Sequence, residues 1–107
     1  MLIVGGENVF PREIEEVLNK HPSVKDSGVV GITDPVRGEL PLAFVELKDD
    51  SGVAFDEKAL LAWCRERLAG YKVPREVRRL DALPRNATGK VSRKDLKRLA
   101  AAPEPRP

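Results

Sequence analysis

The sequence of 107 residues contains little of the material that several classes of functional site require. It has one cysteine, Cys64, and one histidine, His21. A single cysteine excludes an internal disulfide and any cysteine-rich zinc site. A single histidine leaves little for histidine-based metal binding or for Cys–His catalysis. We therefore expect no metal site in this chain.

Aromatic residues make up only 5% of the sequence, and no apolar run approaches the roughly 20 residues of a membrane-spanning helix. The N-terminus has no basic segment followed by an apolar stretch, which is the pattern of a secretory signal peptide. We expect no membrane span and a cytoplasmic location. The hydrophobic content of 41% and the charged content of 34% are typical of one small globular domain.

The chain does contain an uneven distribution of charge. Residues 1–70 hold 8 Lys and Arg against 13 Asp and Glu, a net charge of −5. Residues 71–107 hold 11 against 4, a net charge of +7. A basic C-terminal third favours an anionic partner: a nucleic acid, a membrane surface or the phosphates of a small molecule. A solvated helix face explains the same pattern equally well.

Hydrophobic spacing and capping residues predict three helices. The first covers residues 11–20, with a proline in its first turn and a His-Pro pair after it. The second covers residues 56–69, with Asp56 as its N-cap and Gly70 closing it in a left-handed conformation. The third covers residues 93–101 and follows a serine cap. The face of the second helix that we expect to be buried consists of Leu60, Trp63, Cys64 and Leu68.

Runs rich in β-branched residues predict strands at residues 24–33, 40–48 and 75–80. A short apolar run, Leu2–Val4, stops at two glycines and predicts half of a tight hairpin, poorly ordered without an upstream strand. The pattern predicts an α+β fold: a small central antiparallel sheet of about three strands packed with three helices, plus the short N-terminal hairpin. Residues 102–107 include three prolines and are expected to form a disordered tail.

The most informative segment is the sequence PRNATGK at residues 84–90. Asn86 and Thr88 favour bonds from their side chains to the nearby backbone, and Gly89 permits a positive φ. We therefore expect an exposed loop between a strand and a helix, with Lys90 at its tip. An ammonium held there can meet an anion on another molecule or another domain.

Three motifs together resemble those of one known family. GGENVFP at residues 5–11, followed by EIE at 13–15, resembles the hairpin-to-helix motif of adenylate-forming enzymes. GYKVP at 70–74 resembles their later linker motif, and PRNATGK at 84–90 their terminal lysine motif. The motifs occur in the family's order. The chain thus resembles the C-terminal domain of an acyl- or aryl-CoA synthetase over residues 1–101.

The first motif is most similar to that of acid:CoA ligases, which include fatty-acyl and aryl-CoA synthetases and thus enzymes of fatty acid metabolism. The resemblance implies that ATP, with Mg²⁺ on a large N-terminal domain absent from this chain, converts an acid into an acyl-adenylate. CoA then displaces AMP. Residues 1–101 would be the mobile C-terminal (lid) domain that closes over the large domain in two orientations. We expect this chain to be inactive alone.

The resemblance also implies site residues. Lys90 matches the lysine that enters the active site during adenylation, where an ammonium can bond the acid carboxylate and the α-phosphate together. The residues expected on the CoA side are Gly5, Gly6, Glu7, Arg37, Tyr71, Lys72 and Arg75. The glycines leave room for the pantetheine arm, and Tyr71 can stack on the adenine. Lys72 and Arg75 lie where they can meet phosphates, and Arg37 is a weaker candidate for the same surface.

Two other functions are compatible with the sequence. The basic C-terminal third would suit a freestanding nucleic-acid-binding module, although its cations are not interleaved with the stacking aromatics of common single-strand binders. The chain would also suit a detached lid that acts in trans on a separate large domain.

Overall fold

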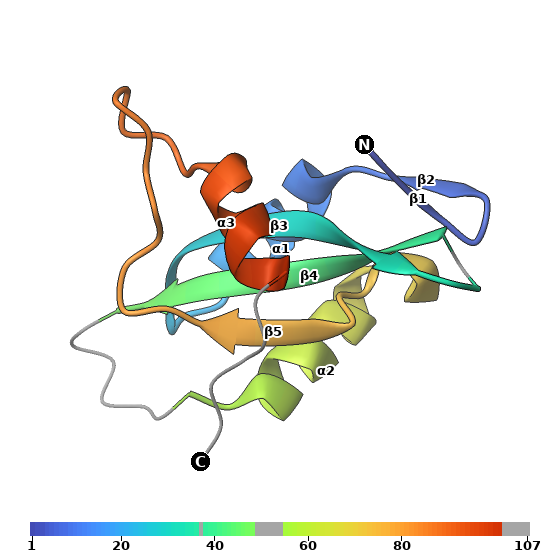
Figure 1. Cartoon of the computed structure of the whole chain (residues 1–107). Coiled ribbons are helices and arrows are strands. Elements are labelled where there is room, and N and C mark those ends of the chain that lie inside the picture. Colours follow the sequence, from blue (N-terminus) through green and yellow to red (C-terminus); the bar gives the residue numbers. More distant parts are fainter. Residues whose placement is uncertain (37, 49–54, 102–107) are drawn as a thin grey trace, which may run out of the picture.

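The computed structural model describes residues 1–36, 38–48 and 55–101. Figure 1 shows a twisted sheet with α3 on one face and α1 and α2 on the other. The elements are, in chain order, β1 (Leu2–Val4), β2 (Glu7–Val9), α1 (Pro11–Asn19), β3 (Val24–Asp34), β4 (Gly38–Leu47), α2 (Glu57–Arg67), the 3-10 helix η2 (Gly70–Lys72), β5 (Glu76–Arg79) and α3 (Arg93–Ala101). The predicted α+β class is confirmed. No described helix is both long enough and apolar enough to cross a membrane.

The sheet has the strand order β2-β1-β4-β3, and β5 also pairs with β4. The β3–β4 pair is antiparallel and forms the centre of the sheet, with Val29 opposite Ala43. The N-terminal hairpin joins it through β1, where Val4 lies opposite Gly38. β5 is parallel to β4, with Val77 opposite Ala43. The parallel pairing follows from the connection, because the chain crosses over through α2 before it returns to the sheet.

Alternating side chains of the central strands form two hydrophobic cores. Ala43 and Val45 of β4 face α1 and α2, where they pack with Ile14 and Leu18 among others. Leu42 and Phe44 face the other way and pack with Leu96 of α3. Because helices cover both faces of the sheet, β4 is apolar at nearly every position rather than at every second one.

Glutamate side chains accept four backbone N–H groups, three on strands and one in the loop before α3. The acceptor carboxylates lie far from their donors in sequence, at distances of 2.8 to 3.2 Å. The donor–acceptor pairs are Ile3 to Glu39, Val29 to Glu15, Val77 to Glu57 and Leu83 to Glu46. A buried N–H without a partner would be destabilising, so these carboxylates hold strand edges and loop starts in place.

The helix limits agree with the sequence predictions except at the end of α2. Asp56 caps α2, since its Oδ1 accepts the N–H of Ala59 at 3.1 Å. The expected left-handed closure at Gly70 is wrong. Helix α2 ends at Arg67, Leu68 is already extended, and Gly70 begins η2 with an ordinary φ.

The expectation that Leu2–Val4 would be poorly ordered is also wrong. Leu2 and Val4 are buried in the core shared with α1 and α2. They are held there because β1 pairs with β2 on one side and with β4 on the other. The hairpin is therefore an integral part of the sheet. The expected tail at 102–107 lies outside the described residues.

Candidate functional site

The loop that carries Lys90 is closed at its base by backbone pairing. Arg85 and Val91 form an isolated antiparallel bridge. Inside this bridge, the N–H of Asn86 donates to the carbonyl of Lys90 at 2.8 Å. The loop is thus a small folded turn attached to the domain through its two ends. Figure 1 shows it projecting at the upper left, between β5 and α3.

The side chain of Asn86 shapes the turn. Its Oδ1 accepts the N–H of Thr88 at 3.0 Å, the hydroxyl of Thr88 at 2.6 Å and the N–H of Lys90 at 3.2 Å. Gly89 has a φ of +85°, which is the left-handed region that glycine adopts without strain. These features confirm the local bonding and the positive φ predicted for this segment.

Lys90 is exposed at the end of this turn. Within residues 1–36, 38–48 and 55–101, its ammonium has no hydrogen-bond or ion-pair partner. Its backbone is fixed, whereas its side chain extends into solvent. The arrangement presents a positive charge that is available to an external anion.

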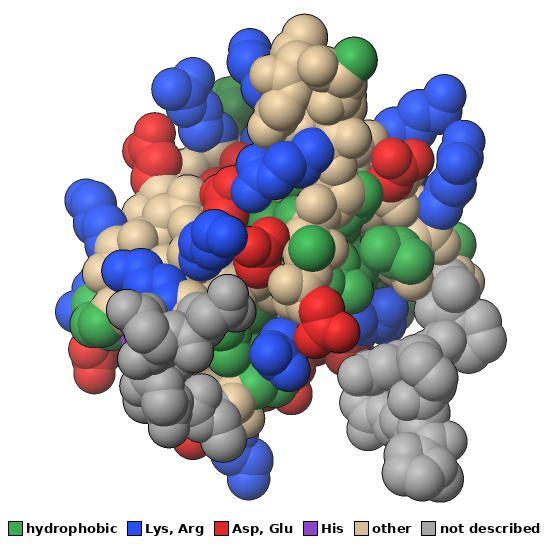
Figure 2. All heavy atoms as spheres, turned by 90° about the vertical axis from the view of Figure 1, so that its left-hand side faces the viewer, with side chains coloured by type: hydrophobic (Ala, Val, Ile, Leu, Met, Phe, Trp, Pro, Cys, Tyr) green, Lys and Arg blue, Asp and Glu red, His purple; other side chains and the backbone are tan. Residues whose placement is uncertain are grey.

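Two arginines fasten this loop to the domain. Arg85 Nη2 lies 2.9 Å from Oδ2 of Asp26 on β3, and Arg93 Nη2 lies 2.6 Å from Oε1 of Glu15 on α1. These four residues and Lys90 share a groove of about 570 Å³. Its other lining residues are Arg12, Asn19, Ser27, Asn86 and Val91. Figure 2 shows basic and acidic side chains interspersed on the side of the molecule where the loop projects.

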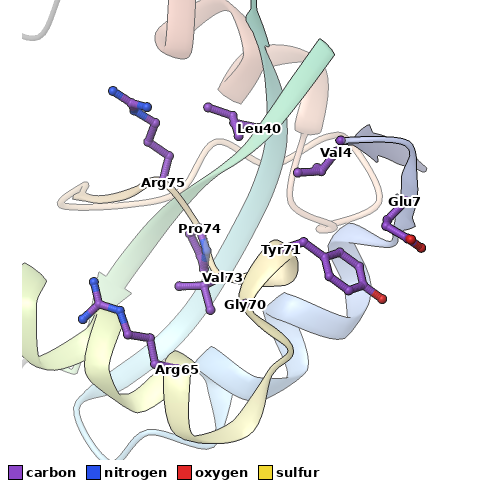
Figure 3. Close-up of a pocket in the computed structure, with 10 residues that line it drawn as sticks. Val4, Glu7, Leu40, Arg65, Gly70, Tyr71, Val73, Pro74 and Arg75 are labelled. Carbon is purple, nitrogen blue, oxygen red and sulfur yellow. The ribbon is translucent and has the colours of Figure 1, made fainter. Parts of the chain in front are cut away.

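A second and larger groove, of about 800 Å³, lies beside the N-terminal hairpin. It brings together four of the residues predicted on the CoA side: Gly5, Glu7, Tyr71 and Arg75. Its other lining residues are Val4, Leu40, Arg65, Gly70, Val73 and Pro74. Figure 3 shows Arg65 and Arg75 along one side of the groove, with Tyr71 and Glu7 toward the other. The groove can accept a ligand that has an aromatic ring and negative charge.

The two hairpin glycines are required by their backbone conformation. Gly5 and Gly6 have φ values of +56° and +85° in a two-residue connection between β1 and β2, as in a type I′ turn. A Cβ placed on either residue would meet no atom within 4 Å. The space outside the turn is therefore open. Gly5 lines the large groove, whereas Gly6 does not.

Lys72, which was predicted on the CoA side, is not among the residues that line this groove. Its Nζ turns to α1, where it lies 2.9 and 3.1 Å from the two carboxylate oxygens of Glu13. This hydrogen bond raises the pKa of Lys72 above its usual value. The ammonium also lies 5.7 Å from the ring centroid of Tyr71, within the range of a cation–π contact. Arg37 lies outside the described residues.

Sequence reasoning missed Arg65. None of the motifs in the sequence includes it, yet it lines the large groove and has no partner among the residues that the structure describes. No local motif marks it, because the groove forms only when α2 packs beside η2. A signal did exist for the buried acid Glu46, which interrupts the apolar run from Leu40 to Leu47 of β4.

Charged side chains alone do not make a metal site here. Among the described residues, no group of three or more His, Cys, Asp and Glu side chains is arranged to hold a metal ion. The features that can contact a ligand are the lysine loop and the large groove. Figure 1 shows the loop at the upper left and the N-terminal hairpin, whose residues Val4, Gly5 and Glu7 line the large groove, toward the other end of the sheet at the right.

Comparison with known proteins agrees with this geometry. The family model described as the AMP-binding enzyme C-terminal domain matches residues 13–90. The 2-succinylbenzoate--CoA ligase of Geobacillus kaustophilus is 52% identical over 99 residues, which are 92% of this chain and 20% of that protein. This chain therefore spans about a fifth of the length of the curated relatives that it matches.

Solved structures give the same result. A Mycobacterium tuberculosis fatty acyl CoA synthetase matches 92% of this chain and 19% of its own chain, with a TM-score of 0.82 and 38% identity. An o-succinylbenzoate CoA synthetase from Bacillus subtilis matches 91% of this chain and 19% of its own, with a TM-score of 0.82 and 42% identity. The family match includes Lys90 and the part of the groove that follows residue 13, with Tyr71 in it, and the chain belongs to the AMP-binding enzyme C-terminal domain family.

Proposed function

We propose that this chain is the mobile C-terminal domain of an ATP-dependent acid:CoA ligase, and that it acts on a larger domain that binds MgATP and the acid. The observation that carries the proposal is the ammonium of Lys90, which is exposed on a folded turn and has no partner in the described part of the chain. The similarity to CoA ligases supports the proposal.

In the first half-reaction an acid carboxylate approaches the α-phosphate of ATP, and both groups are negatively charged. An ammonium between them reduces this repulsion and bonds oxygens of both groups in the transition state. Lys90 is suited to this role because no acid among the described residues of the chain holds its side chain. We propose that it enters the active site of the large domain for this step and leaves it afterwards.

In the second half-reaction the thiolate of CoA attacks the acyl-adenylate. We propose that the large groove receives the nucleotide end of CoA, with Tyr71 beside the adenine and Arg75 near a phosphate. The open space above Gly5 and Gly6 would then guide the pantetheine arm. Since the lysine loop and the hairpin that lines the groove lie toward opposite ends of the sheet in Figure 1, the domain would present them in two different orientations.

The acid is proposed from the relatives. Several of them are 2-succinylbenzoate--CoA ligases, so an aryl acid with a carboxylate side chain is the first candidate, and a fatty acid is the second. Pyrophosphate release by the complete enzyme, measured with 2-succinylbenzoate, benzoate and a long-chain fatty acid, would distinguish them. Turnover with the fatty acid alone would contradict the aryl assignment.

The role of Lys90 is tested by measuring the two half-reactions separately in the complete enzyme. We expect Lys90→Ala to slow adenylate formation by about 10²–10³-fold, because it removes a donor that acts in the transition state. Thioester formation from supplied acyl-adenylate should persist. Lys97→Ala, which removes an exposed lysine from α3, is the matched control and should leave both rates unchanged. Equal loss of both half-reactions in Lys90→Ala would refute the assignment.

A further inference from the structure

Arg85 lies at the base of the lysine loop and makes three contacts there. Its Nη2 lies 2.9 Å from Oδ2 of Asp26, and its Nη1 donates to the carbonyl of Gly89 at 3.2 Å. Oε1 of Glu46 lies 4.0 Å from Nη2. The guanidinium of Arg85 therefore links Gly89, the residue before Lys90, to Asp26 on β3.

The carboxylates around the loop differ in how many partners they have besides an arginine. Glu15 accepts the N–H of Val29 as well as contacting Arg93. Glu46 accepts the N–H of Leu83 and lies 3.2 Å from Lys25. Oδ2 of Asp26, in contrast, has Arg85 as its one partner among the described residues, because the N–H of Ser27 donates to the other oxygen, Oδ1. Asp26 is thus the carboxylate that would lose its partner if Arg85 were removed.

Lys90 lines the same groove as Asp26 and is the cation there without a partner among the described residues. A lysine has a long flexible stem, so it can turn toward a nearby unneutralised carboxylate. We propose that Arg85 is a positioning residue that keeps Lys90 available to an external anion, by occupying Asp26 and by holding the backbone of Gly89. The effect of Arg85 on catalysis rests on the proposed function. Its effect on the position of the Lys90 side chain does not.

The effect of Arg85 on the Lys90 side chain is tested by competitive acylation of the lysines with acetic anhydride. Mass spectrometry of the peptides measures how fast each lysine is labelled. A paired ammonium releases its proton less readily, so it reacts more slowly than a free one. We expect Arg85→Gln to slow the labelling of Lys90 by about three- to tenfold relative to the other lysines. Near-UV circular dichroism of Trp63 reports whether each variant is folded.

Two further variants separate this explanation from a loss of structure. Asp26→Asn keeps an oxygen for the N–H of Ser27 but removes the negative charge. Lys90 should therefore be labelled as fast in the double variant, Arg85→Gln with Asp26→Asn, as in Asp26→Asn alone. Arg79→Gln is the matched control, because Arg79 pairs with the exposed Asp81 and does not line the groove. Unchanged labelling in Arg85→Gln, or slow labelling in the double variant, would overturn the inference.

In the complete enzyme, Arg85→Gln should slow adenylate formation by a similar factor and spare thioester formation from supplied adenylate. The defect should shrink as salt is raised, since an exposed ion pair is screened. A defect in both half-reactions that salt does not relieve would contradict the inference. The proposed function is tested separately by Lys90→Ala. If that variant retains adenylation, the proposed function is wrong, whatever the labelling of Lys90 shows in the Arg85 and Asp26 variants.

Discussion

Glu46 accepts the backbone N–H of Leu83 at 3.0 Å, across 37 positions of sequence. This bond attaches the start of the lysine loop to the end of β4. Because the acceptor is a carboxylate on a nearly buried strand position, the bond is stronger than a neutral one. The hydrogen bond from Leu83 and the charge of Lys25 hold the pKa of Glu46 below its usual value, against the opposing effect of burial.

Glu46 should therefore make the stability of the domain depend on pH in the acid range. The folded state lowers its pKa from 4.5, whereas the unfolded chain keeps the ordinary value. Its contribution is thus present above about pH 4.5 and lost as the pH falls below it. We expect Glu46→Gln to lower the free energy of unfolding by about 1 kcal/mol at pH 7, and by less at pH 3.5. Urea unfolding at the two pH values measures this.

Asp81→Asn serves as the control for Glu46, since the side chain of Asp81 is 97% exposed. It should change the free energy of unfolding by less than about 0.5 kcal/mol at either pH. An equal difference between wild type and Glu46→Gln at both pH values would contradict the assigned cause.

Gly28 lets α3 approach the sheet closely. A Cβ at this position would lie 2.3 Å from Leu96 Cδ1 and 2.9 Å from Val91 Cγ1. Leu96 is fully buried, so it has no free space to move into. We expect Gly28→Ala to destabilise the domain by about 1–3 kcal/mol, as overpacking does elsewhere, and to displace the loop between Leu83 and α3.

Chemical denaturation measures the effect of Gly28→Ala, with Gly70→Ala as the control. A Cβ on Gly70 would meet nothing within 4 Å, and its φ is ordinary. That substitution should change stability by no more than about 0.5 kcal/mol. Equal effects of the two substitutions would show that α3 adjusts without strain.

Arg65 gives a prediction for the large groove in the complete enzyme. Because its guanidinium has no partner in the described part of the chain, it is available to a phosphate of CoA. We expect Arg65→Gln to raise the KM for CoA by about two- to fivefold, the effect of an exposed charge pair, with adenylate formation unchanged. Lys58→Gln, an exposed lysine of α2 outside the groove, should leave this KM unchanged. A matching rise in KM for Lys58→Gln would indicate a general charge effect.

Cys64 should be chemically inert while the domain is folded. Burial raises the pKa of its thiol to about 11, although the nearby Arg67 opposes this effect. At pH 8 almost none of it is thiolate, and reagent has no access to it. We expect no reaction with iodoacetamide in buffer and stoichiometric reaction in urea. Rapid alkylation of the folded protein would show that α2 opens locally.

The sequence predicted most elements because their signals are local. Asp56 caps α2 through a side chain three residues from its donor, and Asn86 bonds within its own turn. The parallel pairing of β5 has no such signal, since it depends on the path that α2 takes across the sheet. For the same reason the groove residue Arg65 was missed.

The residues of the candidate site also differ in whether local or long-range contacts determine their positions. The exposure of Lys90 follows from the turn that carries it, which the residues around it specify. The contact between Lys72 and Glu13 was not predicted, because Glu13 lies on a helix 59 residues earlier in the sequence. Long-range pairing of a cation with an acid can be recognised only once the helices are placed.

The three bonds to Oδ1 of Asn86 have a consequence for molecular association. A loop already ordered by its own side chain loses little conformational entropy when another surface meets it. The free energy of contact between that surface and the tip of the loop is then not offset by the entropy cost of ordering the loop backbone. If the domain moves as proposed, the affinity of each contact would then be set by the lysine side chain and its immediate neighbours.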